Sequence, residues 1–526
     1  MRQRNILIIT IVWALLCGCQ TEGIYDDYEE FNYTIQIHQG VVIQNGTTGE
    51  LSLLQVTQDS VARRVLFTPK KGEVIDTIFA GYEAENSDTL NVLTAVADER
   101  RTDVYPTLNV INVTNGTVTN YILGSRFSRH RFSPDGQMLI LYHGDSDSVN
   151  SGLSNPNEIA IIDLSAAPLA PDREAAVASV PNPRSLSVNV QGRTIESIHF
   201  LDPVQIGNVE TRLVAFVTEG AIQFTNLQSK TLPSVSVSLK NDADSRQIFA
   251  RHFEVIAGTE THGPRVFVQA ENASELYDIE LNPRDNDAGF YATTSLLDGG
   301  STPSDFAVLQ DAGELYVVSA SSQSNVLNVF EASTAHIITL NLSSRVQTIE
   351  TRTTGGRTEL VMYGSGSNRI YFLNETDLAS QMGENLETMI LQENIERAQM
   401  LDNNRLMIYP NTSGLIIADL DSRTVTHLAG NNSREWLNNQ LWNNTLFLAG
   451  NSKIDFLNIL DGTTGFVALD EEIVQFNVFP AQGVGLAIHD TPAGRVTVFP
   501  LAQPTRAACK VFDGFLVNGI LNRGEE

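Results

Sequence analysis

The sequence predicts an all-β protein, a single β-propeller built from four-stranded blades, and three observations lead to that fold class. Short runs rich in Val, Ile, Leu, Phe and Tyr recur along most of the chain, separated by turn-forming Gly, Asn, Asp and Ser. The runs come in groups of four, without a helical hydrophobic pattern between the groups. The shortest interval between groups is close to the roughly 40–50 residues of a propeller blade.

The first eighteen residues have the composition of an export signal. Two arginines precede an apolar run over 6–16, which is shorter than the ~20 residues that a membrane-spanning helix needs. The stretch LCGC follows at 16–19. It resembles the lipobox of bacterial lipoproteins, with Gly18 in the position of the small residue before the lipidated cysteine. The resemblance implies that residues 1–18 are a signal peptide and that Cys19 receives the acyl chains, palmitate among them. An ordinary secretory signal is the alternative.

The segment 19–33 reads as an acidic tether between this anchor and the folded body. Two or three acyl chains suffice for stable membrane attachment, where one chain is marginal. Gln20 follows the lipidated position, and by analogy with the sorting rule of enteric bacteria this implies the outer membrane. We therefore expect a protein of the bacterial cell envelope that is held to a membrane by its N-terminal lipid. Whether it faces the periplasm or the cell surface stays open.

Charge excludes some partners. The formal net charge is −28 at pH 7, so nucleic acids and anionic headgroups are disfavoured, whereas basic proteins and cations are allowed. Charged residues make up 18% of the chain and hydrophobic residues 42%, a balance typical of a globular protein. Once the signal and the lipid have taken two of the three cysteines, Cys509 is left, so stability must come from the core rather than from a disulfide.

The body, 34–526, is expected to form one propeller. Nine groups of strands start near residues 74, 127, 195, 248, 304, 346, 395, 434 and 473. Because single propellers usually have about four to eight blades, we expect eight, with seven or nine as alternatives. Residues 31–70 are expected to supply the outer strand that latches the last blade. A β-sandwich array and two smaller propellers are the competing architectures, but no Pro- or Ser-rich linker divides the body.

Hairpin turns are expected at the same place in successive blades. Asn115-Gly116, Ser422-Arg423 and Thr464-Gly465 lie at corresponding corners between the third and fourth apolar runs. Gly supplies a positive φ at little steric cost, and polar turn residues hydrogen-bond locally. These corners predict that the third strand of each blade turns directly into the fourth.

One blade carries a recognisable motif, RFSPDGQMLILYH at 131–143. It resembles the WD40-like repeat of periplasmic propellers such as that of the Tol system, in which the FSPDG segment turns the innermost strand into the second. The anchor and the repeats also resemble the propeller lipoprotein of the outer-membrane barrel-assembly machinery. Both resemblances imply a scaffold that binds another envelope protein.

Candidate functional residues are few. The insertion 144–156 is far longer than a hairpin needs, and its Asp145, Asp147 and Asn150 are the predicted binding residues. Their spacing resembles the start of a calcium loop, so a structural Ca²⁺ is considered; no other cofactor or metal is expected. The nearest candidates at the inner-strand ends facing the central channel are Asp202, Asp305, Asp311 and Asp402, and the first to test are Asp305 and Asp402.

Two function classes follow from these residues. We expect a membrane-anchored, monomeric scaffold that binds a protein or another ligand, and not nucleic acid. The alternative is a propeller hydrolase or lyase with a polar or cation site in the channel. The chain has no nucleophile elbow, zinc helix or phosphate-binding loop, so no catalytic residue is assigned and enzymatic activity stays open.

Overall fold

The computed structural model describes the chain from residue 34 to residue 515, with gaps. The gaps are residues 38–39, 45–48, 84–86, 97–104, 144–157, 169–181, 188–194, 202–203, 207–208, 219, 228–233, 240–249, 257–263, 272, 284–289, 312, 322, 335, 375–377, 379–385, 413, 429–437 and 490. Among the residues that the structure describes, no helix is both long and apolar enough to cross a membrane.

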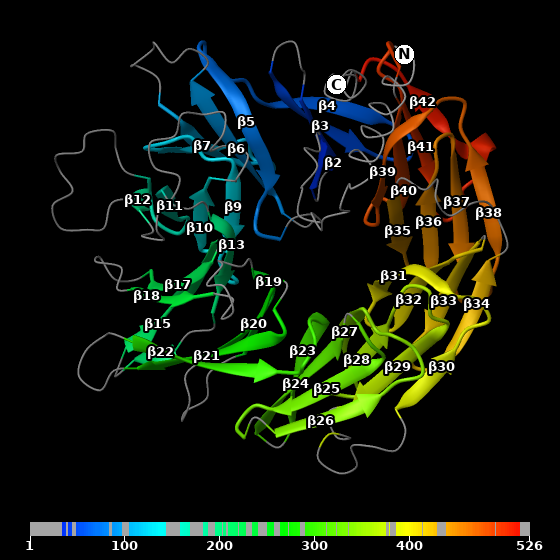
Figure 1. Ribbon diagram of the computed structural model, residues 1–526. Coiled ribbons are helices and arrows are strands. Elements are labelled where there is room, and N and C mark those ends of the chain that lie inside the picture. Colours follow the sequence, from blue (N-terminus) through cyan, green and yellow to red (C-terminus); the bar gives the residue numbers. More distant parts are fainter. Residues whose placement is uncertain are drawn as a thin grey trace, which may run out of the picture.

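Ten four-stranded antiparallel sheets follow one another around a ring (Figure 1). We number them as blades 1 to 10 in chain order. Blades 1 to 5 comprise β1 (Thr34–Ile37), β2 (Gly40–Gln44), β3 (Leu51–Val56), β4 (Val61–Phe67); β5 (Glu73–Ala80), β6 (Thr89–Val96), β7 (Thr107–Asn112), β8 (Val118–Ile122); β9 (Arg129–Phe132), β10 (Met138–Tyr142), β11 (Glu158–Asp163), β12 (Arg184–Ser187); β13 (Ile195–Phe200), β16 (Leu213–Thr218), β17 (Ala221–Asn226), β18 (Ser234–Ser238); and β19 (Ala250–Ile256), β20 (Arg265–Ala270), β21 (Glu275–Pro283), β22 (Phe290–Asp298).

Blades 6 to 10 continue the same order. They comprise β23 (Pro303–Asp311), β24 (Glu314–Ser321), β25 (Val326–Glu331), β26 (His336–Asn341); β27 (Thr348–Thr354), β28 (Arg357–Tyr363), β29 (Arg369–Asn374), β30 (Glu387–Ile390); β31 (Ile395–Asp402), β32 (Arg405–Pro410), β33 (Leu415–Asp419), β34 (Thr424–Leu428); β35 (Asn438–Trp442), β36 (Thr445–Ala449), β37 (Lys453–Asn458), β38 (Thr464–Ala468); and β39 (Ile473–Phe479), β40 (Val484–His489), β41 (Val496–Pro500), β42 (Lys510–Phe512). A small hairpin, β14 (Val204–Ile206) and β15 (Val209–Thr211), is inserted in blade 4, and the 3₁₀ helix η4 (Arg506–Ala508) precedes β42.

The core lies between the blades. Most second and third strands are buried on both faces, and β16, β17 and β40 are buried at every position. Such strands are continuous apolar runs rather than alternating ones because neighbouring blades cover both faces. One cluster, for example, joins Leu327 and Val329 of blade 6 to Leu360 and Met362 of blade 7.

The first strands lie innermost in the ring (Figure 1), and those of neighbouring blades contact each other, as β19 contacts β23 and β23 contacts β27. In six blades the described first strand has a register shift near its start, for instance between Pro303 and Asp305. A β-bulge of this kind redirects the side chain that follows it.

The expected number of blades was wrong. All nine predicted groups exist, but residues 34–67 form a tenth complete sheet instead of an outer strand for the last blade. The reason is that β42 already supplies the outer strand of blade 10 by pairing with β41. An all-β single propeller is confirmed; eight, seven and nine blades are excluded.

Side chains close the ring. Blade 1 contributes Val41 and Leu54 to a cluster with Val484 and Leu486 of blade 10. At the inner edge, Gln36 donates to the carbonyl of Val478 at 2.9 Å and accepts from the Asn477 amide at 2.7 Å. No described strand of blade 1 pairs with one of blade 10, so apolar burial and amide hydrogen bonds take the place of a shared strand.

Arginines cross four of the blade interfaces and reach equivalent acceptors, although the arginines themselves lie on different strands, β4, β12, β20 and β27. Each arginine donates to the carbonyl of the residue just after the third strand of the next blade. The pairs are Arg64 with Val113, Arg184 with Leu227, Arg265 with Ala332, and Arg352 with Leu420. Among the described residues they join blades 1 and 2, 3 and 4, 5 and 6, and 7 and 8.

Two of the three predicted hairpin corners are confirmed. Gly116 and Arg423 have φ of 73° and 55° in the turns between the third and fourth strands. The third corner was placed wrongly, because the residue with positive φ is Gly462, at 72°, whereas Gly465 lies inside β38. A Cβ on Gly465 would lie 2.3 Å from the ring of Phe456, so close packing requires that glycine rather than the turn.

The FSPDG turn joins β9 to β10, as predicted. Gly136 has φ of 66°, and Asp135 accepts from the N–H of Gln137 at 3.1 Å. The turn also contacts both neighbouring blades, because Asp135 pairs with Arg212 and the hydroxyl of Tyr82 donates to Pro134. The motif therefore holds three blades together at this rim.

Candidate functional site

The predicted binding and anchoring residues lie outside the part of the chain that the structure describes. These are Cys19 in the predicted lipobox and Asp145, Asp147 and Asn150 in the insertion. Their lipidation and binding roles therefore stay predictions. Asp305 and Asp402 are described, and they lie in two different places.

Asp305 and Asp402 do not form one channel site. Asp305 lies near the start of β23, and Asp402 is the last residue of β31. Because the first strands of all blades run in the same direction, these positions face opposite rims of the ring. Asp305 belongs to an inner-strand cluster, defined as His199, His252, Glu254, Asp305, Glu350 and Tyr363; Asp402 lines a separate pocket.

A His–Asp pair is the centre of the inner-strand cluster. Nδ1 of His252, on blade 5, donates to Oδ1 of Asp305 at 2.8 Å. The N–H of Phe306 donates to the same oxygen at 3.0 Å, and that of Ile349, on blade 7, donates to Oδ2 at 2.7 Å. The Asp305 carboxylate therefore links three blades, and it orients an imidazole that is 37% exposed.

Glu254 lies two residues after His252 on β19, hence on the same side of the strand. Burial raises the pKa of Glu254 to about 7; the nearby charge of Asp305 adds to the rise, and the N–H of Val308 and His252 oppose it. Oε2 of Glu254 is buried and accepts no hydrogen bond from the described residues. The side chain is therefore divided between its charged and neutral forms near neutrality.

Glu350 and Tyr363 extend the cluster onto blade 7. Burial, and then the charge of Asp305, raises the pKa of Glu350. The hydroxyl of Tyr363 lies 3.4 Å from Oε1 of Glu350, and burial raises the pKa of Tyr363. The charge of Asp305 thus raises the pKa of one carboxyl group on each neighbouring blade, Glu254 on blade 5 and Glu350 on blade 7.

His199 completes the cluster from blade 4. Its ring stacks on Phe253 at 4.1 Å, and its Nε2 lies 3.0 Å from the Ser197 hydroxyl. Burial lowers the pKa of His199 to about 4, and the charges of Arg131 and His252 lower it further. The cluster combines proton donors and acceptors whose pKa values are moved apart, a pattern typical of functional sites.

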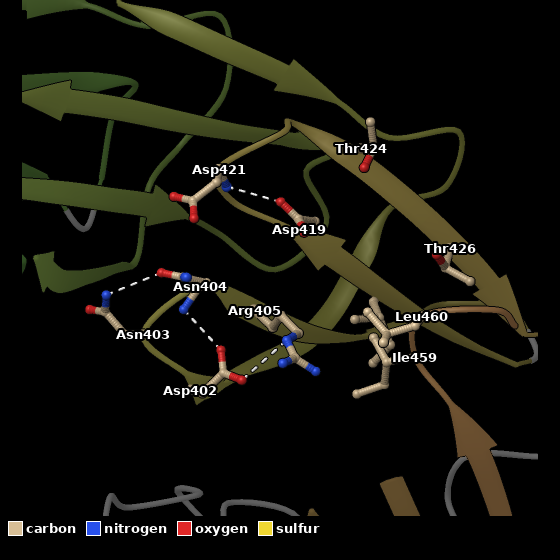
Figure 2. A pocket seen from close by; sticks show the side chains of 11 residues that line it. Asp402, Asn403, Asn404, Arg405, Asp419, Asp421, Thr424, Thr426, Ile459 and Leu460 are labelled. Atoms are coloured by element: carbon tan, nitrogen blue, oxygen red, sulfur yellow. Dashed lines mark hydrogen bonds and ion pairs between the residues drawn. The ribbon is translucent and has the colours of Figure 1, made fainter. Parts of the chain in front are cut away.

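The rim pocket has a volume of about 570 Å³ and lies where blade 8 meets blade 9 (Figure 2). Its walls come from the turn after β31, from β33 and β34 with the turn between them, and from the turn after β37. The lining residues are Asp402, Asn403, Asn404, Arg405, Ile417, Asp419, Asp421, Thr424, Thr426, Ile459 and Leu460.

Three aspartates line this pocket, and hydrogen bonds hold each of them (Figure 2). Asp402 accepts from the N–H of Asn404 at 2.9 Å and pairs with Arg405 at 3.2 Å. Asp419 accepts from the N–H groups of Asp421 and Ser422 at 3.1 and 2.7 Å. Burial alone would raise the pKa of Asp419, but these N–H donors and Arg405 lower it. Its carboxyl is therefore ionised in neutral solution.

Asp421 connects the pocket to the core. One of its oxygens accepts from Arg352 of blade 7 at 2.8 Å, yet the side chain is 49% exposed. Leu460, on the opposite wall, is 75% exposed. The pocket thus presents oriented carboxylates beside an apolar surface.

Sequence reasoning found Asp305 and Asp402 but missed their partners. His252 and Glu254 come from another blade, and no local sequence pattern indicates that β19 packs beside β23. The DNN run at 402–404 and the DLD run at 419–421 are ordinary turn sequences, and only packing makes them walls of one pocket. Among the described residues, no group of three or more His, Cys, Asp or Glu is arranged to hold a metal ion.

Comparison with known proteins does not assign this chain to a family. No model of a known protein family matches the chain. No curated protein matches it either. Among solved structures it is similar to the "Structure of Dos1 propeller", at 12% identity over 68% of this chain and 87% of the other, with a TM-score of 0.38.

Two further structures are similar to a comparable extent. For dihydro-heme d1 dehydrogenase NirN in complex with DHE, the identity is 12% over 68% of this chain and 70% of the other, with a TM-score of 0.37. For BBS1N in complex with ARL6DN, it is 13% over 63% and 88%, with a TM-score of 0.33. Likenesses at this level carry no inference about function, and the ten-bladed propeller rests on its own strand pairing.

Proposed function

We propose that the chain is a lipid-anchored scaffold of the bacterial cell envelope that binds a basic segment of another envelope protein in its rim pocket. The observation that carries the proposal is the pocket itself, about 570 Å³ with three oriented aspartates and one arginine on its walls. The LCGC stretch at 16–19 supports the anchor.

Lysine and arginine side chains fit this pocket chemically. Their aliphatic stems pack on apolar surface while the charged head stays with polar groups. Leu460 offers the apolar surface, and Asp421 engages one carboxylate oxygen with Arg352 while remaining half exposed. Because the aspartates are already fixed by hydrogen bonds, little conformational freedom is lost when a cation binds. The acidic charge of the whole chain favours encounter with a basic partner.

A lysine-rich peptide tests the pocket. We expect isothermal titration to show binding that weakens between low and high salt, because the attraction is screened. The double variant Asp402→Asn with Asp421→Asn should bind at least about tenfold more weakly, an effect of about 1.4 kcal/mol. The double variant Asp59→Asn with Asp470→Asn is the matched control, since it removes two exposed charges that do not line the pocket. If the control loses as much affinity for the peptide, the effect comes from the net charge of the chain and not from the pocket, which contradicts the proposal.

The anchor is tested separately. Cys19→Ala should leave unprocessed precursor that takes up no label from a palmitate analogue, whereas Cys17→Ala should be processed and labelled normally. Labelling of the Cys19→Ala variant would remove Cys19 as the acylated residue and, with it, the proposed attachment to the membrane.

The insertion 144–156 is a second candidate surface on the same scaffold. If Asp145, Asp147 and Asn150 bind the partner or a Ca²⁺ ion, replacing the insertion by a two-residue turn should reduce capture of the partner with little change in thermal stability. A large fall in the melting temperature would instead mark the insertion as packed structure.

A further inference from the structure

Two equivalent positions on the inner strands hold side chains of nearly the same shape, of which one can ionise. Glu254 on β19 pairs across its hairpin with Phe267, and Gln440 on β35 pairs with Phe447; each phenylalanine is the third residue of its second strand. Glu254 accepts from the N–H of Val308 on the next blade. Gln440 accepts from the N–H of Val478 on the next blade in the same way.

The partners are equivalent too. Val308 and Val478 both lie three residues after the residue that follows the bulge, Asp305 in one blade and Gln475 in the other. The amide of Gln440 also donates from Nε2 toward the carbonyl of Phe476 at 3.5 Å. The corresponding carbonyl in blade 6 is that of Phe306. A carboxyl group can reproduce both bonds of the amide only while it carries a proton.

We propose that Glu254 is a proton-dependent latch between blades 5 and 6, closed when its carboxyl is protonated and loosened when the carboxyl ionises. In the closed form one oxygen accepts from Val308 and the protonated oxygen copies the amide donor of Gln440. In the ionised form Oε2, which is buried and without a hydrogen-bond donor among the described residues, carries charge close to Asp305. Solvation of that charge requires the side chain to leave the interface.

The surroundings favour the protonated form. Among the described residues, His252 on the same strand is the titratable group that favours the ionised form of Glu254, and it already donates to Asp305. Asp305 on β23 opposes ionisation, and Glu350 with Tyr363 lies on its far side. On the other side, burial lowers the pKa of His199, and the charge of Arg131 adds to the effect. Burial raises the pKa of Glu254 to about 7, so the latch responds near neutrality.

Hydrogen exchange of the whole chain, read by mass spectrometry between pH 6 and pH 8.5 and corrected for intrinsic rates, tests the latch. We expect the opening of β23 to increase more than about tenfold over this range. Glu254→Gln installs the amide that blade 9 uses, and it should abolish this increase. Glu271→Gln, an exposed position in the same blade, should preserve it.

Two further variants keep the proposal open to refutation if Glu254→Gln folds poorly. Gln440→Glu should create a similar pH-dependent opening of β39. Asp305→Asn removes a charge that opposes ionisation, so it should move the midpoint of the β23 opening to lower pH. Exchange of β23 that does not vary with pH in the natural chain, or that varies equally in Glu254→Gln, overturns the proposal. So does a Gln440→Glu variant without pH dependence.

Discussion

At the scale of single residues, buried histidines make the fold sensitive to acid. His130 stacks on Phe79 with ring centroids 3.7 Å apart. Burial lowers its pKa from 6.5 to about 4, and Arg131 adds to the effect. Between these values the unfolded chain binds a proton that the folded chain does not, so stability is full above about pH 6.5 and falls as the pH drops toward 4.

Replacing His130 by Phe tests this account. The aromatic stack on Phe79 is kept, and the acid-sensitive group is lost. Between pH 7.5 and pH 4.5 the free energy of unfolding should fall in both proteins. We expect the fall to be smaller in the variant than in the natural chain, by up to about 3 kcal/mol. Denaturant unfolding at the two pH values measures the difference. Equal losses in both proteins would show that His130 has no part in the acid response.

At the scale of elements, a buried ion pair within blade 7 also contacts blade 8. Arg352 and Glu359 lie 2.5 Å apart, and both side chains are 2% exposed. Glu359 also pairs with Arg423 at 2.7 Å, and Arg352 reaches Asp421 and the carbonyl of Leu420 on the next blade. The pair therefore fixes how the two blades meet, beside the wall of the rim pocket.

Arg352→Ala should cost about 3–5 kcal/mol of unfolding free energy, because it leaves buried Glu359 with less compensation. Arg126→Ala is the control. Arg126 pairs with Asp76 but is 57% exposed, so its loss should cost at most about 1 kcal/mol. Chemical denaturation measures both. Similar small costs for the two variants would mean that the buried network contributes nothing specific to the interface.

At the scale of the whole molecule, the ring depends on every blade being present, because no described strand is shared between the first and the last. Blade 1 packs on blade 10 through one apolar cluster and on blade 2 through another, in which Val42 and Leu53 meet Leu90 and Val92. Its removal exposes two apolar blade faces at once.

Deletion of residues 34–67 should therefore abolish the monomeric fold. We expect the truncated chain to bind a hydrophobic dye and to elute as aggregates in size-exclusion chromatography, since large exposed apolar faces associate. A soluble monomer with the far-ultraviolet circular dichroism of the full chain would contradict this.

Local patterns were enough to determine the all-β class, the nine strand groups that begin near residue 74 and later, and the FSPDG turn. The reason is that hydrophobic periodicity, turn chemistry and the φ of residues such as Gly116 are set by near neighbours. The same patterns misplaced the third corner, since Gly465 is required by the ring of Phe456 and not by a turn.

Only the tertiary structure decided the number of blades and the composition of both candidate sites. Whether residues 34–67 form a blade or a latch depends on which strand completes blade 10, and β42 takes that edge by pairing with β41. His252 meets Asp305, and Asp402 shares a pocket with Asp421 and Leu460, because blades pack side by side. Such contacts depend on the geometry of the closed ring, and a single strand group contains no information about its neighbour across the interface.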